Sequence, residues 1–419
     1  MEENLTGADY TDYESNFTDC TYIGTDHLEV KIYLIGVFAT FIAILSIIFN
    51  TFFTVVFLTN HSIRKSPVFY FGILAVIDTV MAVNYIALMS IPVYMDYYHI
   101  LPVYYLFLSY FRVILMESNS AMFASMLLIV LATTERLLRT FHGATILKAR
   151  KFLTNHRPSV CAFVILLAIA YKICNYWETD VQWKPMCEGW GQYEIIPGPL
   201  TAYYNYKFWW MFITRNALDR ILPFFVLVAM NYLIIKALKK EYVRQSVSKY
   251  PSTKKAPSIQ LVFDEACTST EVFQDATRAL ISIVSMYLMS QSLQVVLTFW
   301  ETFDRESLES EEMELVYSYL NDIVSILTLL SSCLRFPVYC SCNRLISSAS
   351  AQTLRQLKSM CFEEKKIAQR YSPIQNCQHL AQKDGDQMYK SSDTSGQPGT
   401  AEAKISGAVY NDVLKEWQL

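Results

Sequence analysis

Seven apolar stretches dominate the sequence, and each is long enough to cross a bilayer as a helix. A hydrocarbon core of about 30 Å takes roughly 20 helical residues, and a backbone in lipid must satisfy its own hydrogen bonds, which excludes an open sheet. The chain is 53% hydrophobic and 17% charged, against about 25% charged for soluble domains, which excludes a soluble enzyme. We predict an all-α membrane protein, a seven-transmembrane helix bundle, with spans at 32–58, 67–91, 102–134, 159–177, 208–235, 276–300 and 315–340.

The distribution of Lys and Arg predicts an extracellular N-terminus in a multi-pass plasma-membrane protein. In this orientation the three inner loops hold fifteen Lys and Arg and the C-terminal tail holds ten more, whereas the outer segments hold four. Such an excess marks the cytoplasmic side. Two Asn-x-Thr acceptors, at Asn4 and Asn16, fall in the segment placed outside, so we expect both to be glycosylated.

The remaining segments divide the chain into four parts. Residues 1–31 form the extracellular tail and 32–340 the membrane domain. In 341–370, apolar residues recur at helical spacing with basic residues between them, which predicts a juxtamembrane amphipathic helix on the inner surface of the membrane. Residues 371–419 are rich in Gln, Ser, Asp and Gly, and we expect a disordered cytoplasmic tail.

Catalytic and metal-binding motifs are missing from the sequence. It has no His–Cys spacing typical of a metal site, no phosphate-binding loop, no nucleophile elbow and no HExxH. We therefore expect a protein that is not an enzyme, has no catalytic residue, binds no metal, cofactor or nucleic acid, and is embedded in the lipid bilayer.

An acid–arginine pair, Glu135-Arg136, closes the third apolar stretch in the string TTERLLRT. Charges at a membrane boundary are costly, and those that persist often serve a function. One interpretation is a switch in which Glu135 holds Arg136 and releases it to a cytoplasmic partner. The alternative is an interfacial pair that reaches into the headgroups.

Four further positions match one known family: Asn50 in the first helix, Asp78 in the second, Ser125 in the third and Pro223 in the fifth. Together with Glu135-Arg136, they make residues 30–360 resemble the rhodopsin-like G-protein-coupled receptors. That resemblance implies a receptor that signals by helix rearrangement to a cytoplasmic G protein and also binds arrestin. It assigns Glu135, Arg136 and Tyr339 to the switch.

At several positions the sequence departs from the usual pattern of this family, and these departures point to a subgroup of it. The sixth helix has no proline, Phe111 occupies the place of the family's third-helix cysteine, and the last helix ends in RFPVY where the family has NPxxY. Together with the string LTFWE at 297–301, these features look like invertebrate, especially nematode, receptors for FMRFamide-like neuropeptides.

The resemblance also implies a polar cluster in the core. In the family, an acid, serines and a seventh-helix Asn surround a sodium ion, but Arg335 stands at the Asn position here. We expect Arg335 to replace sodium as the partner of Asp78, because a buried carboxylate needs one. The alternative is that Arg335 extends toward the inner headgroups. The cluster comprises Asn50, Asp78, Ser125, Ser331, Ser332 and Arg335.

With Phe111 in place of the usual cysteine, the family's outer disulfide needs another partner for Cys187. Cys174 and Cys20 both face the oxidising side in the predicted topology. We favour Cys174–Cys187, because the connection is short and Cys174 ends the fourth helix. Cys20 remains the alternative.

Acidic residues outnumber basic ones in the outer segments, by twenty to four. A surplus of this kind concentrates cationic ligands, and with the resemblance it indicates an extracellular peptide ligand, amidated and ending in Arg-Phe. The alternative is that these acids only hydrate the surface. The candidate ligand-binding residues are Glu117, Trp209, Arg215, Asp219, Glu301 and Asp322.

Some of these candidates also have structural interpretations. Trp209 belongs to an aromatic group that would suit a membrane interface equally well. Arg215 and Asp219 are four residues apart and are as well explained by a mutual ion pair.

Two other functions share parts of this sequence pattern. A chemosensory seven-helix receptor for a small molecule has the same architecture. A transporter typically has repeated halves and broken helices, and the odd number of spans and lack of a repeat disfavour it.

Overall fold

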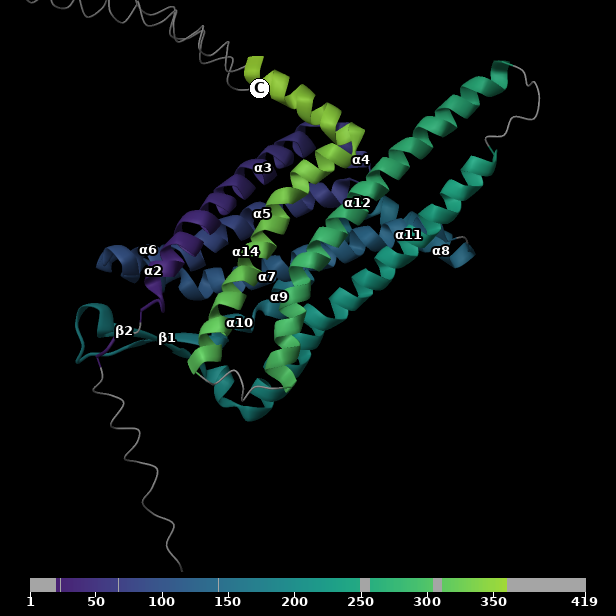
Figure 1. Cartoon of the computed structure of the whole chain (residues 1–419). Helices are drawn as coiled ribbons and strands as arrows, with labels where there is room; N and C mark the ends of the chain where they lie inside the picture. Colours follow the sequence, from purple (N-terminus) through teal and green to yellow (C-terminus); the bar gives the residue numbers. More distant parts are fainter. Residues whose placement is uncertain are drawn as a thin grey trace, which may run out of the picture. The chain divides into compact units, whose positions relative to one another are not determined.

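The computed structural model describes residues 20–359, except 23, 67, 142, 249–256 and 304–310. Within these residues, seven helices are long and apolar enough to cross a membrane, which confirms the all-α seven-helix prediction (Figure 1). Asn4, Asn16, the tail from 371 and residues 304–310 of the acidic loop 301–314 lie outside the described part. The spans are Leu28–Thr59, Phe69–Tyr98, Leu101–Thr140, Arg157–Glu178, Tyr206–Ala237, Leu280–Phe303 and Leu315–Cys342.

The first three spans are continuous helices joined by short connections. Two of them contain a π-helical stretch. The label η marks a helix that is not α-helical. In chain order the elements are α2 (Leu28–Lys31), η2 (Ile32–Ala39), α3 (Thr40–Thr59), α4 (His61–Lys65), α5 (Phe69–Tyr85), η3 (Ile86–Ser90), α6 (Ile91–Tyr98) and α7 (Leu101–Thr140).

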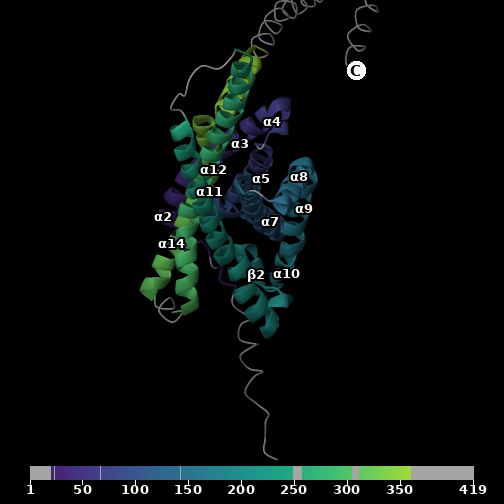
Figure 2. The same cartoon turned by 90° about the vertical axis from the view of Figure 1, so that its right-hand side faces the viewer.

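The other four spans are separated by a helix on the inner side and a hairpin on the outer side, where inner and outer refer to the orientation predicted from the Lys and Arg distribution. The elements are α8 (Ala144–Asn155), α9 (Arg157–Lys172), α10 (Asn175–Glu178), β1 (Thr179–Trp183), η4 (Gly189–Gln192), β2 (Tyr193–Pro197), η5 (Pro199–Ala202), η6 (Tyr206–Thr214), η7 (Asn216–Ile221), α11 (Leu222–Ser248), α12 (Pro257–Phe303) and α14 (Glu311–Cys342). Of the η elements, η4 and η5 are 3₁₀ helices, and the others are π-helices. The strands β1 and β2 are antiparallel, with Val181 opposite Ile195. In the membrane domain α12 packs between α11 and α14 (Figure 1, Figure 2).

Close helix packing forms the core in the inner half of the bundle. Helices α3 and α5 approach so closely at Gly72 that a Cβ there would lie 2.3 Å from the ring of Phe57. Tyr339 of α14 is buried and stacks on Phe71 of α5 at 4.6 Å between ring centroids. Phe163 and Leu166 of α9, in contrast, are each 65% exposed. Apolar side chains that point outward from a span suit a lipid environment.

After the last span, residues 344–359 are helical. The Asn343 side chain precedes this segment, and its Oδ1 accepts hydrogen bonds from the amides of Leu345 at 3.0 Å and Ile346 at 3.3 Å. An Asn in this place satisfies amides that lack a helical partner. The helix predicted within 341–370 is therefore present as far as the structure describes that segment.

Candidate functional site

At the inner end of α7, Glu135 belongs to a cluster of three charged side chains, which we call the inner ion cluster (Glu135, Arg139, Arg157). The Glu135 Oε1 accepts from Arg139 and Arg157, both at 2.6 Å, and its Oε2 accepts from Arg157 Nε at 3.1 Å. The Glu135 side chain is 1% exposed. Charge-assisted bonds to a guanidinium fork are among the strongest polar contacts in proteins.

The Glu135 carboxylate is bound by Arg139, one turn along α7, and by Arg157 of α9. Residues four apart on a helix share a face, whereas adjacent residues point about 100° apart. Arg136 is buried, and the expected hold of Glu135 on Arg136 stays a prediction.

Arg157 connects three parts of the inner surface. Besides Glu135, it donates from Nη1 to the backbone carbonyls of Lys65 and Ser66, both at 3.1 Å, between α4 and α5. In the sequence, Arg157 is one of the positive charges of the inner loops. Its one distinguishing signal is Pro158, which favours a helix that starts at this position. Whether an arginine in the first turn faces the bundle depends on how the helix is rotated about its own axis. This rotation cannot be read directly from the sequence.

The predicted contact between Asp78 of α5 and Arg335 of α14 is present, and we call it the core pair. Arg335 Nη1 lies 2.5 and 2.7 Å from the two Asp78 carboxylate oxygens and 3.3 Å from Ser125 Oγ. The two side chains are 1% and 4% exposed. Arg335 therefore points into the bundle and not toward the inner headgroups. The other members of the predicted cluster, Asn50, Ser331 and Ser332, are buried as well.

In the outer half of the bundle, charged side chains from the fourth and fifth spans surround a cavity of about 220 Å³, which we call the bundle cavity. Lys172 of α9 forms an ion pair with Asp219 of η7, and Arg215 forms one with Glu178 of α10. Arg220 donates to Thr298 Oγ1 of α12 at 3.0 Å. The cavity is lined by Asn119, Met122, Phe123, Met126, Lys172, Asn175, Arg215, Asp219, Arg220, Tyr287, Gln291 and Gln294.

A proline explains part of this geometry. Pro223 has no N–H and cannot close the α-helical hydrogen bond to residue 219. Directly before it, Asn216–Ile221 is π-helical, a wider turn that is frequent at functional sites. The side chains of Asp219 and Arg220 are carried by this wide turn.

The mutual ion pair between Arg215 and Asp219 is not formed. Each side chain crosses to the fourth span, where Glu178 and Lys172 are its partners. A pair within the fifth span would leave these two buried charges without countercharges, at high cost. Lys172, Glu178 and Arg220 were not predicted as site residues. Each is a charged residue inside or at the end of an apolar helix, and the same criterion would have identified them as candidates.

The predicted ligand-binding residues do not converge on one cavity. Arg215 and Asp219 line the bundle cavity. Trp209 is 60% exposed, which fits an interface position, and Glu117 is exposed as well. Glu301 is half-buried near the outer end of α12.

Asp322 lines a separate outer hollow of about 630 Å³, shared with Asp26, His27, Tyr317 and Asn321. Its Oδ2 lies 3.8 Å from Lys31 Nζ. With Lys31 beside Asp322, the two acids leave this hollow one net negative charge, so it suits a ligand cation better than the bundle cavity, where cations outnumber acids in the lining.

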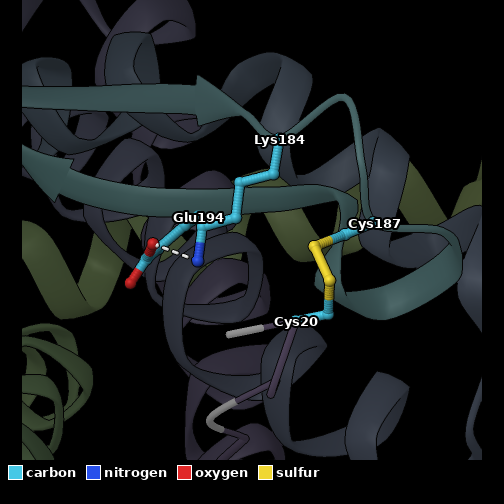
Figure 3. The surroundings of a disulfide bond; sticks show 4 residues. All are labelled: Cys20, Lys184, Cys187 and Glu194. Atoms are coloured by element: carbon cyan, nitrogen blue, oxygen red, sulfur yellow. Dashed lines mark ion pairs between the residues drawn. A yellow bond between two sulfur atoms is a disulfide. The ribbon is translucent and has the colours of Figure 1, made fainter. Parts of the chain in front are cut away.

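The outer disulfide joins Cys20 to Cys187, with Cα atoms 5.5 Å apart, and not Cys174 to Cys187 (Figure 3). Cys174 lies between α9 and α10, where its Sγ accepts from Trp210 Nε1 at 3.4 Å, so its side chain is directed at the fifth span. Cys187 follows β1 and meets the N-terminal segment. A Cβ on Gly191 would lie 2.3 Å from the Cys20 carbonyl oxygen, so this approach requires glycine.

Asp96 of α6 is a second attachment point for the N-terminal segment. Its carboxylate accepts from Tyr22 Oη at 2.7 Å, from the Thr25 amide at 2.8 Å and from Thr25 Oγ1 at 2.6 Å. Burial and the neighbouring carboxylate raise the pKa of Tyr22 above its usual value. The segment is thus fixed to the outer ends of the bundle both covalently and by hydrogen bonds.

Comparisons with other proteins do not add a family assignment. No model of a known protein family matches the chain, and no curated protein matches it either. Among the described residues, no group of three or more His, Cys, Asp or Glu side chains is placed to hold a metal ion.

Proposed function

We propose that this protein is a cell-surface receptor that passes an extracellular signal to a cytoplasmic G protein. The seven-helix fold is compatible with this role. The observation that carries the proposal is the inner ion cluster, in which Glu135 on the third span holds Arg157 on the fourth. A buried contact of this kind between two helices can stabilise one arrangement of the inner surface over another.

In this mechanism, the ligand shifts the population between two arrangements of the bundle. It does so only if it binds one arrangement more tightly than the other. Rearrangement of the inner helix ends would separate Glu135 from Arg157 and open a surface for the G protein, with arrestin as a later partner of the same surface. Arg136 and Tyr339, both buried, take part in that change as the resemblance implies.

The test is basal signalling of an Arg157→Gln variant. Loss of the guanidinium weakens the contact between the spans, so we expect raised ligand-independent G-protein activation at equal surface expression. Arg150→Gln is the matched control, because Arg150 is an exposed cation on the neighbouring helix α8. Basal activity unchanged from wild type in both variants would contradict the proposed role of the cluster.

For the ligand, we propose a neuropeptide that carries a basic residue, FMRFamide-like in class. The support is the excess of outer acids in the sequence together with the outer hollow that contains Asp26 and Asp322. A peptide guanidinium would bind these carboxylates. A small-molecule ligand is the second candidate, favoured by the size of the bundle cavity, about 220 Å³.

A dose–response series separates these two candidates. The series comprises an amidated peptide with an arginine, its citrulline analogue and its free-acid form. We expect the citrulline analogue to be weaker, and more so at low ionic strength, because screening reduces charge attraction. Equal potency of the arginine and citrulline peptides, or activation by small molecules only, would reject the basic peptide.

A further inference from the structure

We propose that the bundle cavity binds the carboxylate group of the ligand, with Arg220 as the main contact. The proposal rests on the proposed receptor function and specifies the chemistry of its ligand. In an amidated peptide this carboxylate belongs to an Asp or Glu side chain of the ligand, while a basic residue of the same peptide binds in the outer hollow.

Among the described residues, only one of the three cations at the cavity has no acid in contact. Asp219 pairs with Lys172, and Glu178 pairs with Arg215 and accepts from Tyr206 Oη at 2.6 Å. The third cation, Arg220, is attracted by Glu301 of α12 and by Asp219 without an ion pair to either. We call Arg220 the surplus charge in this sense.

Arg220 makes hydrogen bonds to neutral oxygens only, as far as the described residues show. Thr298 Oγ1 accepts from Nη1 at 3.0 Å. With its carboxamide oxygen turned inward, Gln294 accepts from Nε and Nη2, both at 3.3 Å. No described carboxylate lies within 4 Å of the Arg220 guanidinium. An unmatched charge inside a membrane span is costly and marks an ion or ligand site by default.

The remaining walls suit an organic anion better than a hydrated ion. Met122, Phe123 and Met126 of α7 and Tyr287 of α12 line the same cavity. The other uncharged lining residues are amides, Asn119, Asn175, Gln291 and Gln294. Small-ligand sites combine apolar surface with polar groups that fix the orientation of the ligand. The planar guanidinium of Arg220 fits a carboxylate, while an aromatic or aliphatic body of the ligand would pack on these four side chains.

The experiment measures the thermal stability of the purified full-length protein in detergent. The probes are N-acetylphenylalanine, which has a carboxylate, its amide, which has the same shape without the charge, and inorganic phosphate. A compound that binds only the folded state raises Tm. We expect the acid to raise Tm of the wild type by several degrees and the amide to have little effect.

Variants assign the effect to Arg220. In Arg220→Gln we expect a higher Tm than in the wild type when no probe is present, because the surplus charge is gone. We also expect that the acid reaches half of its effect at a concentration about tenfold or more higher than in the wild type, because its charged hydrogen-bond partner is lost. Arg220→Lys keeps the charge but loses the planar fork, so its response should be intermediate. Arg112→Gln is the control: Arg112 pairs with Asp180 at 2.9 Å outside the cavity, and its response should equal that of the wild type.

Three results would overturn the proposal. Equal stabilisation by the amide would show that the cavity recognises only the apolar body. Equal stabilisation by phosphate would show an adventitious ion only, and a full response in Arg220→Gln would show that another group binds the acid. No G protein is present in this assay, so an acid effect that depends on Arg220 would stand even if the protein failed to activate any G protein.

Discussion

The core pair offers a quantitative test of the packing between α5 and α14. We consider Asp78→Asn and Arg335→Met, alone and combined. Each single change leaves one charged side chain, Arg335 or Asp78, that is at most 4% exposed. Among the described residues, that side chain then has no ion-pair partner of opposite sign. Breaking a buried pair from one side costs about 3–5 kcal/mol.

The magnitude follows from the geometry. At 2.5–2.7 Å between Arg335 Nη1 and the Asp78 oxygens, attraction at an effective dielectric constant of about 20 is roughly 6 kcal/mol. Desolvation of the two groups offsets most of this attraction. The double variant removes both the attraction and the desolvation, so we expect its unfolding free energy to lie within about 1–2 kcal/mol of the wild type, with a coupling energy of about 3 kcal/mol or more.

The assay is reversible unfolding of the purified protein in mixed micelles, followed by circular dichroism as SDS is added. Arg150→Gln serves as the control, because Arg150 is exposed on α8 and its loss should be almost neutral. The reasoning is refuted if the two single changes cost less than about 1 kcal/mol each, or if their effects simply add in the double variant.

Three further predictions concern the outer surface and the core. Deglycosidase treatment should increase the gel mobility of surface protein, and Asn4→Gln/Asn16→Gln should abolish that shift; a wild type without a shift would contradict glycosylation. Mass mapping of non-reduced peptides should find Cys20 joined to Cys187 and Cys174 free; a Cys174–Cys187 peptide would contradict the fold of the outer surface. Agonist affinity should not respond to sodium, because the Arg335 guanidinium occupies the position beside Asp78; a sodium-specific change in wild-type affinity would argue against this.

The sequence was sufficient to predict the spans and the core pair. Runs of apolar residues of membrane length have one stable solution, a helix. Asp78 and Arg335 are charges inside such runs, and the resemblance to a known fold placed them face to face. The structure has them in contact.

The partners of the other charges depend on how each helix is rotated, and rotation results from packing over the whole bundle. Arg157 and Lys172 lie at the two ends of α9, and the sequence gives no direct sign that both side chains face inward. For the same reason Cys174 was expected to meet Cys187, whereas its Sγ faces Trp210. Short separation along the chain predicts a disulfide only if the two side chains point toward each other.

The central claim is that the inner ion cluster restrains a surface that activates a G protein. Its most direct test is GDP release from purified G proteins of each major class, measured with the purified protein in lipid nanodiscs without ligand. We expect Arg157→Gln to accelerate release from at least one class above the wild type, and an added Arg136→Ala to remove that acceleration. If Arg157→Gln leaves the release rate of every class at the value measured with empty nanodiscs, the claim is contradicted.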